Sequence, residues 1–258
     1  MKQSKLSISK RQMERKDLPL GDLIIEIGQC FPHAPYKTGT LEAAGKEKLI
    51  VNFRQFDCFT FVETVLALAY CFIGGRTSAR EFQRKLKFIR YRQGIISGYS
   101  SRLHYFTDWL SDNEKKKIIC DVSKTIGGKP CRKKINYMTT HRASYPALKN
   151  EKEFLKMLHF EKHLSRKVFC IVDSDKVNQQ KEKIKNGDII AFATDQAGLD
   201  VAHVGFAFWQ GKDFYLLHAS SKERTVVIST KTLISYLKQN KKCSGIIIAR
   251  PLSSVQMS

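Results

Sequence analysis

The longest apolar segment of the chain begins directly after a cysteine. Residues 59–73 are apolar around nearly the whole helical circumference, with polar side chains such as Glu63 only near the start. A helix that is apolar on every face lies buried inside a domain. Asp57 suits its N-cap, so Cys58 falls at the helix N-terminus, where the helix dipole favours a thiolate over a thiol. The pattern predicts a nucleophile on a buried helix, although a small core cysteine is the commoner explanation for such a segment.

Apolar residues recur with helical spacing in four further segments. The second of these opens with the capping box Ser78–Glu81. Residues 95–110 are dense in Gly, Ser and aromatic side chains without a clean period, so we expect a loop there and a new helix from Ser111. Such a loop either lines a site or packs aromatic rings over the core. The four helical segments are residues 18–30, 76–91, 150–165 and 230–240.

From residue 186 the periodicity changes to that of a sheet. Asn186-Gly187 is a tight-turn signal. Helices followed by a late antiparallel sheet describe an α+β domain. With no internal repeat, we expect a flexible basic arm at 1–16 and a single domain at 17–258. The predicted strands are residues 188–193, 201–209, 214–220, 224–228 and 245–250.

Two histidines fall on neighbouring strands of this sheet. If Gln210-Gly211 forms a two-residue hairpin loop, Trp209 pairs with Lys212. His203 then lies directly opposite His218 on the same face, with Cβ atoms ~5 Å apart. Two histidines that meet in this way can serve as a base and the group that fixes its tautomer. A slip of one residue would separate them.

These residues combine into a recognisable chemistry. Cys58, His203 and His218 form the Cys–His–polar pattern of thiol acyl transfer. The same three side chains are also a chemically reasonable zinc ligand set, but a single cysteine at a helix start suits a nucleophile better. His159 and His163 are four residues apart on a predicted helix, yet no third ligand is suggested nearby. We therefore expect neither a metal nor a cofactor.

The net charge of the chain excludes few classes of binding partner. The 258 residues carry 45 Lys and Arg against 24 Asp and Glu, a net charge of +21. This favours nucleic acid, anionic lipid or an anionic wall polymer. The basic residues are dispersed and lack an aromatic-interleaved or zinc-finger pattern, so no specific nucleic-acid partner is expected.

Compartment and redox state stay open at this point. No apolar run reaches the ~18–20 residues that a membrane span needs. Residues 1–16 lack the apolar core of a signal peptide, which indicates either a cytosolic protein or the loss of a leader. The seven cysteines include no CxxC pair, and a disulfide between Cys120 and Cys131 remains an alternative.

Several motifs around these residues resemble a known family. They are F-P-H-A-P-Y at 31–36, F-D-C-F-T-F-V-E at 56–63, S-R-L-H-Y-F at 101–106, G-D-I-I at 187–190, A-H-V-G at 202–205 and L-H-A-S at 217–220. Together they resemble the N-acetylmuramoyl-L-alanine amidase-like branch of the NlpC-type cell-wall cysteine hydrolases, from about residue 18 to 250. The segments D-C-F-T-F-V-E at 57–63 and S-R-L-H-Y-F at 101–106 are more particular to this branch, whereas the D-C, G-D-I-I and H-V-G motifs are shared by the wider superfamily.

The resemblance implies a papain-like α+β fold, in which the nucleophile helix packs on the C-terminal antiparallel sheet. It implies Cys58 as nucleophile, His203 as base and His218 as the third polar residue. Tyr36 matches a position whose hydroxyl lies near the active site in relatives. The implied substrate is the amide between N-acetylmuramic acid and L-alanine in muropeptides or peptidoglycan fragments. The implied setting is periplasmic or secreted, with a cytoplasmic one left open.

Substrate contacts are expected from the motif at 101–106. We assign Ser101, Arg102 and Tyr105 to substrate binding, Arg102 because its fork of donors suits a peptide carboxylate. Two alternatives remain. One is a D-glutamyl–diamino acid endopeptidase of the same superfamily, and the other is a non-catalytic basic protein that binds nucleic acid or an anionic polymer. The oligomeric state is open.

Overall fold

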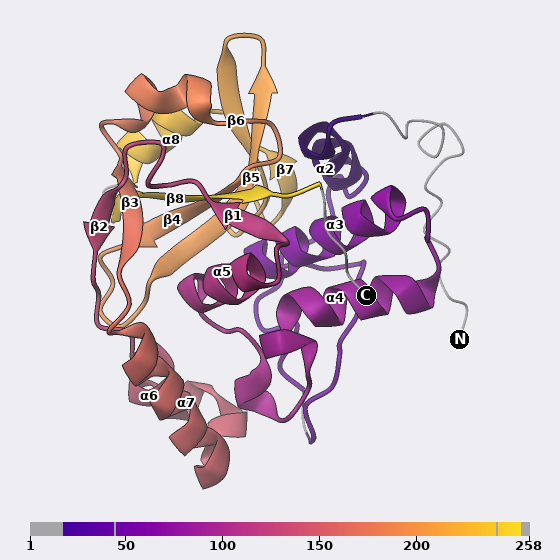
Figure 1. Cartoon of the computed structure of the whole chain (residues 1–258), viewed down its shortest axis with the longest axis vertical. Coiled ribbons are helices and arrows are strands. Elements are labelled where there is room, and N and C mark those ends of the chain that lie inside the picture. Colours follow the sequence, from indigo (N-terminus) through magenta and orange to yellow (C-terminus); the bar gives the residue numbers. More distant parts are fainter. Residues whose placement is uncertain (1–17, 44, 241, 254–258) are drawn as a thin grey trace.

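The computed structural model describes residues 18–43, 45–240 and 242–253, so the expected arm at 1–16 lies outside the described residues. Helices α2 to α5 gather on one side of a sheet, and α6 and α7 extend below them (Figure 1). This arrangement confirms the α+β class. Among the described residues, no helix is long and apolar enough to cross a bilayer. The helices are α2 (Leu20–Gln29), α3 (Cys58–Ile73), α4 (Ala79–Arg90), α5 (Phe106–Lys115), α6 (Tyr137–Thr140), α7 (Glu151–Leu164) and α8 (Leu233–Gln239).

The strands of the described residues form one antiparallel sheet in the order β2-β3-β8-β4-β5-β6-β7, with β1 pairing to β8. The apolar strand β8 lies inside the sheet between β3 and β4, as expected for its continuous hydrophobic run. The strands are β1 (Ile119–Asp121), β2 (Lys129–Cys131), β3 (Phe169–Asp173), β4 (Ile189–Thr194), β5 (Val201–Gln210), β6 (Asp213–Ser220), β7 (Thr225–Ile228) and β8 (Cys243–Pro251). Cys120 and Cys131 remain thiols.

Helix α3 is the central element of the core. Every residue from Thr60 to Cys71 is buried, as the apolar pattern predicts. The helix packs on β5 and β6, with the rings of Phe61 and Phe206 6.1 Å apart. Burial of such large side chains stabilises a domain by roughly 1.5–3 kcal/mol each. The helix that carries Cys58 is therefore among the most firmly held parts of the chain.

The expected loop at 95–110 is wrong in its last third. Helix α5 begins at Phe106, so the expected helix start at Ser111 lies inside it. Phe106, Trp109 and Leu110 are spaced for one helical face and are all buried. Their packing against the core outweighs the local capping signal at Ser111.

A buried ion pair joins α3 to α4. Arg90 Nε donates to Glu63 Oε2 at 2.5 Å, and both side chains are at most 2 % exposed. Arg90 also donates to the Ile50 carbonyl oxygen at 2.7 Å. Burial raises the pKa of Glu63, and the nearby Arg90 charge acts against that rise. Glu63 is thus a partner of Arg90 inside the protein and takes no part in the helix cap.

We expect Arg90→Met to lower the free energy of unfolding by about 3–5 kcal/mol, because it leaves the Glu63 carboxylate buried without a counter-charge. The double variant Arg90→Met/Glu63→Leu should recover most of that loss, since it leaves no buried charge. Urea denaturation followed by circular dichroism measures both. A single variant as stable as the double variant would contradict the expectation.

Candidate active site

Cys58 is the first residue of α3, and the cap beside it is complete. Asp57 Oδ1 accepts hydrogen bonds from the backbone N–H groups of Phe59 at 3.1 Å and Thr60 at 2.7 Å. In return Thr60 Oγ1 accepts a bond from the Asp57 N–H at 3.0 Å. This reciprocal capping box confirms Asp57 as the N-cap and fixes the first helical turn. Cys58 therefore has a defined position at the end of a rigid element.

His203 and His218 meet, but in a different register from the predicted one. The hairpin pairs Gln210 with Asp213, which makes Gly211-Lys212 the loop and shifts the pairing by two residues. The predicted register is wrong because glycine is needed at the first loop position, where φ is 64°. A shift of two keeps every side chain on its face. The histidines are thus diagonal neighbours, and His203 Nε2 lies 2.6 Å from His218 Nδ1.

Gly205 makes room for this diagonal contact. In the observed register Gly205 falls opposite His218, and a Cβ at Gly205 would lie 2.8 Å from the His218 Cβ. A side chain there would push His218 away from His203. On the other side of His203, the pairing of β4 with β5 shifts between Phe192 and Ala193, which leaves a bulge at Ala202. Bulges of this kind re-aim side chains beside active sites.

Cys58 and His203 line the same cavity, which has a volume of about 320 Å³. The cavity lies between the N-terminus of α3, the start of β5 and the loop at 98–105. His218 supports His203 from behind, through the 2.6 Å contact. The polar side chains that line the cavity also include Glu42, Glu63, Arg90, Arg102, His104 and Asp200.

Burial controls the protonation of the three central groups. It raises the pKa of the Cys58 thiol to about 12, and the Asp57 carboxylate adds to the rise. Burial lowers the pKa of His203 to about 4. It lowers that of His218 to about 3, with a further contribution from His203. The resting site thus holds a thiol and neutral imidazoles, and burial outweighs the helix dipole that favoured a thiolate.

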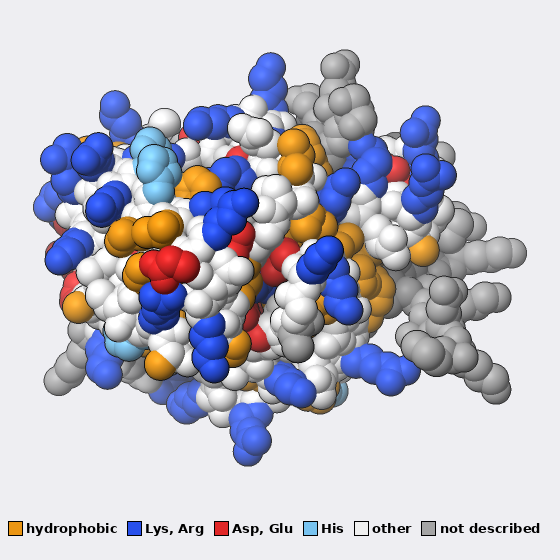
Figure 2. All heavy atoms as spheres, turned by 90° about the horizontal axis from the view of Figure 1, so that it is seen from below, with side chains coloured by type: hydrophobic (Ala, Val, Ile, Leu, Met, Phe, Trp, Pro, Cys, Tyr) orange, Lys and Arg blue, Asp and Glu red, His pale blue; other side chains and the backbone are white. Residues whose placement is uncertain are grey.

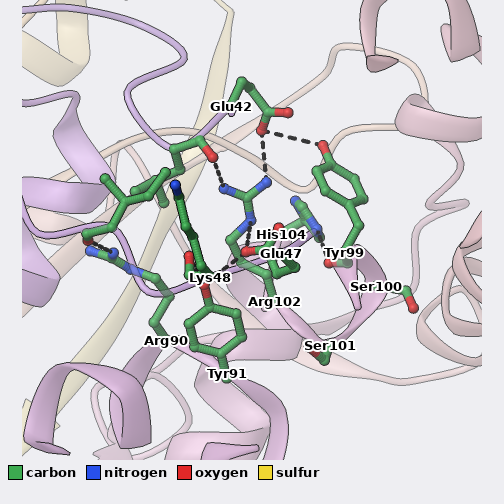
Figure 3. Close-up of polar contacts among 12 residues, drawn as sticks. Glu42, Glu47, Lys48, Arg90, Tyr91, Tyr99, Ser100, Ser101, Arg102 and His104 are labelled. Atoms are coloured by element: carbon green, nitrogen blue, oxygen red, sulfur yellow. Dashed lines mark hydrogen bonds and ion pairs between the residues drawn. The ribbon is translucent and has the colours of Figure 1, made fainter. Parts of the chain in front are cut away.

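Of the expected substrate-binding residues, Tyr36 and Arg102 lie at the site. Burial raises the pKa of Tyr36 to about 12, and the nearby Cys58 and Asp57 contribute. Arg102 lines the cavity but is only 4 % exposed. Its Nη2 donates to Glu42 at 2.8 Å and its Nη1 to the Leu41 carbonyl at 2.8 Å, as Figure 3 shows for Glu42.

Ser101 and Tyr105 are used elsewhere. Ser101 Oγ donates to the Gly98 carbonyl at 2.6 Å and holds the loop in its turn. Tyr105 donates to Glu161 at 2.7 Å and accepts from the Met138 N–H at 2.9 Å, which ties the loop to α6 and α7. Both hydroxyls are thus engaged within the fold.

Sequence reasoning gave no role to two residues of this cavity. His104 Nε2 donates to the Tyr99 carbonyl at 3.0 Å, so its Nδ1 is left as an acceptor. Burial lowers the pKa of His104 well below its usual value and keeps the ring neutral. Glu42 accepts from Arg102 and, at 3.3 Å, from Tyr99. No periodicity marks Glu42, and the motif around His104 indicates a site without assigning a role.

The cavity offers no evident metal site. In the described part of the chain, no three His, Cys, Asp or Glu side chains are placed to hold an ion together. His203 Nε2 and His218 Nδ1 face each other, so these two atoms are occupied by their own hydrogen bond. His159 and His163 are exposed on α7.

The chain is similar to several proteins of known structure. It is 37% identical to an N-acetylmuramoyl-L-alanine amidase from Bacteroides uniformis, with 90% of this chain and 99% of that chain covered and a TM-score of 0.86. It is 40% identical to a putative xylanase from Bacteroides fragilis, with 87% and 99% covered and a TM-score of 0.83. A protein from Legionella pneumophila at 24% identity, with 95% and 93% covered and a TM-score of 0.71, shares the fold.

The comparison with family models agrees with these structural similarities. None of the curated proteins matches the chain significantly. The model of the AmiA-like family, described as N-acetylmuramoyl-L-alanine amidase-like, matches residues 26–246, which include both histidines and the cysteine helix. The chain therefore belongs to the N-acetylmuramoyl-L-alanine amidase-like family.

Proposed function

We propose that the protein is a cysteine amidase that hydrolyses the amide between N-acetylmuramic acid and L-alanine in muropeptides. The observation that carries the proposal is the cavity shared by Cys58 and His203, with His203 hydrogen-bonded to His218. A thiol, a base and a group that orients the base are the parts that thiol acyl transfer needs. On the same grounds we propose that the chain is a papain-like hydrolase of the NlpC-type superfamily.

In this proposal His203 acts through Nδ1, because its Nε2 is occupied by His218. The resting thiol is protonated, so its proton passes to His203 as Cys58 Sγ attacks the lactyl carbonyl carbon. Asp57 already occupies the N–H groups of Phe59 and Thr60. The Cys58 N–H is then the first-turn donor that, with a neighbouring donor, holds the oxyanion.

The second half of the reaction returns the site to its resting state. The imidazolium of His203 gives its proton to the amine of L-alanine as the carbon–nitrogen bond breaks, and the lactyl group remains as a thioester on Cys58. Water then attacks the thioester while His203 accepts a proton. Sγ leaves and regains that proton, so one water is consumed for each amide cleaved.

Arg102 and Tyr36 are the proposed substrate contacts. Glu42, the partner of Arg102, has a side chain 37% exposed and can move aside for a peptide carboxylate. Arg102 Nε lies 3.6 Å from Glu47 Oε1, an ion-pair contact too long for a hydrogen bond, so it gains a hydrogen-bond acceptor when such a carboxylate binds. Ser101 and Tyr105 act on the substrate indirectly, by holding the loop that carries Arg102.

The name of one neighbour, a putative xylanase, raises glycoside hydrolysis as an alternative. That reaction generally needs two carboxyl groups that are available as acid and as base or nucleophile. Three carboxylates of this cavity are committed elsewhere: Asp57 caps α3, Glu63 pairs with Arg90, and Asp200 accepts from Thr107. Glu42, which accepts from Arg102, is the fourth, so the cavity offers one exposed carboxyl group where two are needed. We therefore favour amide hydrolysis.

We propose a periplasmic or secreted location, because peptidoglycan fragments are the substrate class of the family. Lys and Arg side chains are spread over the face in Figure 2 among acidic, apolar and neutral ones. This dispersion fits a surface adapted to an anionic wall better than a dedicated binding groove. A non-catalytic polymer binder would instead show steeply salt-dependent binding and no effect of thiol alkylation.

Cys58→Ala should lower the turnover of muropeptides at least about 1,000-fold while leaving their binding measurable, because it removes only the nucleophile. Mass spectrometry of defined muropeptides after incubation is the test. A free stem peptide and free sugar indicate the proposed bond, whereas release at the D-glutamyl–diamino acid bond indicates the alternative endopeptidase.

Cys71→Ala is the matched control, since Cys71 is a buried cysteine of the same helix that does not line the cavity. It should retain turnover. Undiminished activity of Cys58→Ala would overturn the proposed mechanism.

The acidic limb of the pH profile of kcat/KM should lie near pH 4 instead of near 6.5, the ordinary value for histidine. Burial lowers the pKa of His203, so its neutral, base form persists as the pH falls and is lost only below the folded-state value. Initial rates from pH 3 to 8 give the limb, and circular dichroism at each pH shows whether the chain stays folded. A limb near 6.5 in folded protein contradicts this expectation.

Gly205→Ala should lower kcat/KM about 100-fold, because the new Cβ pushes His218 out of line with His203. The downfield proton signal of the histidine pair in NMR should weaken at the same time. Gly211→Ala at the turn of the same hairpin is the control, because its Cβ meets nothing within 4 Å. It should lower stability, since alanine is strained at a φ of 64°, but leave kcat/KM and the NMR signal unchanged. Equal loss in the two variants would argue against a role of Gly205 in positioning.

A further inference from the structure

A second cavity lies behind the histidine pair. It has a volume of about 370 Å³ and is bounded by the end of β6, the β6–β7 loop, β7 and α8. His218 lines this cavity, whereas His203 lines the cavity that holds Cys58. The two rings therefore span the wall between the two cavities, joined by the 2.6 Å contact of Nε2 with Nδ1.

One nitrogen of His218 has no partner in the described protein. The residue is only 3 % exposed, and its Nδ1 bonds to His203, but its Nε2 makes no hydrogen bond to any described residue. Polar atoms of largely buried side chains normally find a hydrogen-bond partner. His218 lines the second cavity and its Nε2 is accessible from it, so the partner of this atom, a ligand or water, lies in the cavity.

The tautomer of the pair decides what that partner must offer. His203 keeps Nδ1 free to accept the Cys58 proton, so its own hydrogen is on Nε2 and is donated to His218 Nδ1. The hydrogen of neutral His218 is then on Nε2, which makes this atom a donor toward the second cavity. The ligand must present a hydrogen-bond acceptor. This step rests on the proposed role of His203.

The charges around the cavity favour an anion. Lys222 and Lys231 line it against the single carboxylate of Glu223, and hydroxyl and amide groups supply further polar contacts. The titratable groups in contact with His218 are His203 from β5 and Tyr236 from α8, whose ring lies 6.3 Å away, whereas the three charged side chains line the same cavity. We propose that this cavity binds a small carboxylate anion, which accepts a hydrogen bond from Nε2 of His218.

A carboxylate in this position strengthens the base of the active site. A negative charge beside His218 stabilises the protonated form of the histidine pair. The pair then accepts the Cys58 proton more readily, because its basicity moves closer to neutral pH. The bound anion thus adds one acceptor to the series Cys58–His203–His218. Turnover then responds to the concentration of small carboxylates around the protein.

The test compares sodium acetate with sodium chloride at equal ionic strength, on the full chain at slightly acidic pH. The rate of Cys58 alkylation by iodoacetamide, followed by peptide mass mapping, should rise saturably by about threefold in acetate, which corresponds to about half a pKa unit. At the same pH, the NMR signals of the His218 ring should shift saturably with acetate and stay unchanged in chloride. Equal alkylation rates and equal His218 signals in the two salts would mean that the cavity holds only water, and would overturn the proposal.

Charge variants locate the effect. Lys222→Gln and Lys231→Gln should weaken the acetate response, and Glu223→Gln should strengthen it, with little change in chloride. Lys238→Gln, on α8 but outside the cavity lining, is the control and should respond like the parent chain. An acetate response that is the same in the Lys222, Lys231 and Glu223 variants as in the parent chain would mean that acetate binds elsewhere, and would overturn the proposal. Neither readout involves muropeptides, so a failed acetate test leaves the amidase test standing, and the converse also holds.

Discussion

The enclosure of α3 is the constraint on which the site depends. The helix is buried from Thr60 to Cys71 between α2, α4 and the sheet. The side chains around it are closely packed: a Cβ on Gly28 of α2 would lie 2.7 Å from Leu217 and 3.4 Å from Phe61. A close-packed helix of this kind cannot slide along its axis without opening cavities in the core. The position of its first residue, Cys58, is therefore set by the same packing that sets the position of β5.

Charged groups beneath the cavity hold the segment that leads into α3. Its described residues, 41–43 and 45–56, contain no helix or strand, apart from an isolated bridge at Phe56. Arg102 donates to the Leu41 carbonyl and Arg90 to the Ile50 carbonyl, so two buried guanidinium groups replace the missing backbone partners of this segment. Buried ion pairs add little net stability compared with apolar packing. Their value here is positional, because they fix one wall of the cavity.

Features with a local cause could be predicted from the sequence. The cap at Asp57 and the apolar run of α3 follow from residue types a few positions apart. The face shared by His203 and His218 follows from strand alternation, but their register does not, because a shift of two leaves the hydrophobic pattern unchanged. The turn geometry of Gly211 decided it.

Features with a distant cause could not be predicted in this way. Tyr105 has its hydroxyl partner 56 residues further along the chain, at Glu161, and the raised pKa of Cys58 comes from burial by several elements at once. A motif that places Ser101 and Tyr105 next to Arg102 therefore identifies the loop without separating the residues that touch the cavity from those that support it.

The protonated state of Cys58 also determines how readily this side chain is oxidised. Peroxides and other mild oxidants react with thiolates, and the first product, a sulfenic acid, is the start of irreversible loss. A thiol whose pKa is raised to about 12 by burial presents very little thiolate to such reagents. The proposed nucleophile is thus held in a form that resists oxidation, and in the proposed reaction it becomes reactive only when a substrate carbonyl is in place to receive the sulfur. An amidase that works as proposed would keep its activity in surroundings that contain no thiol reductant.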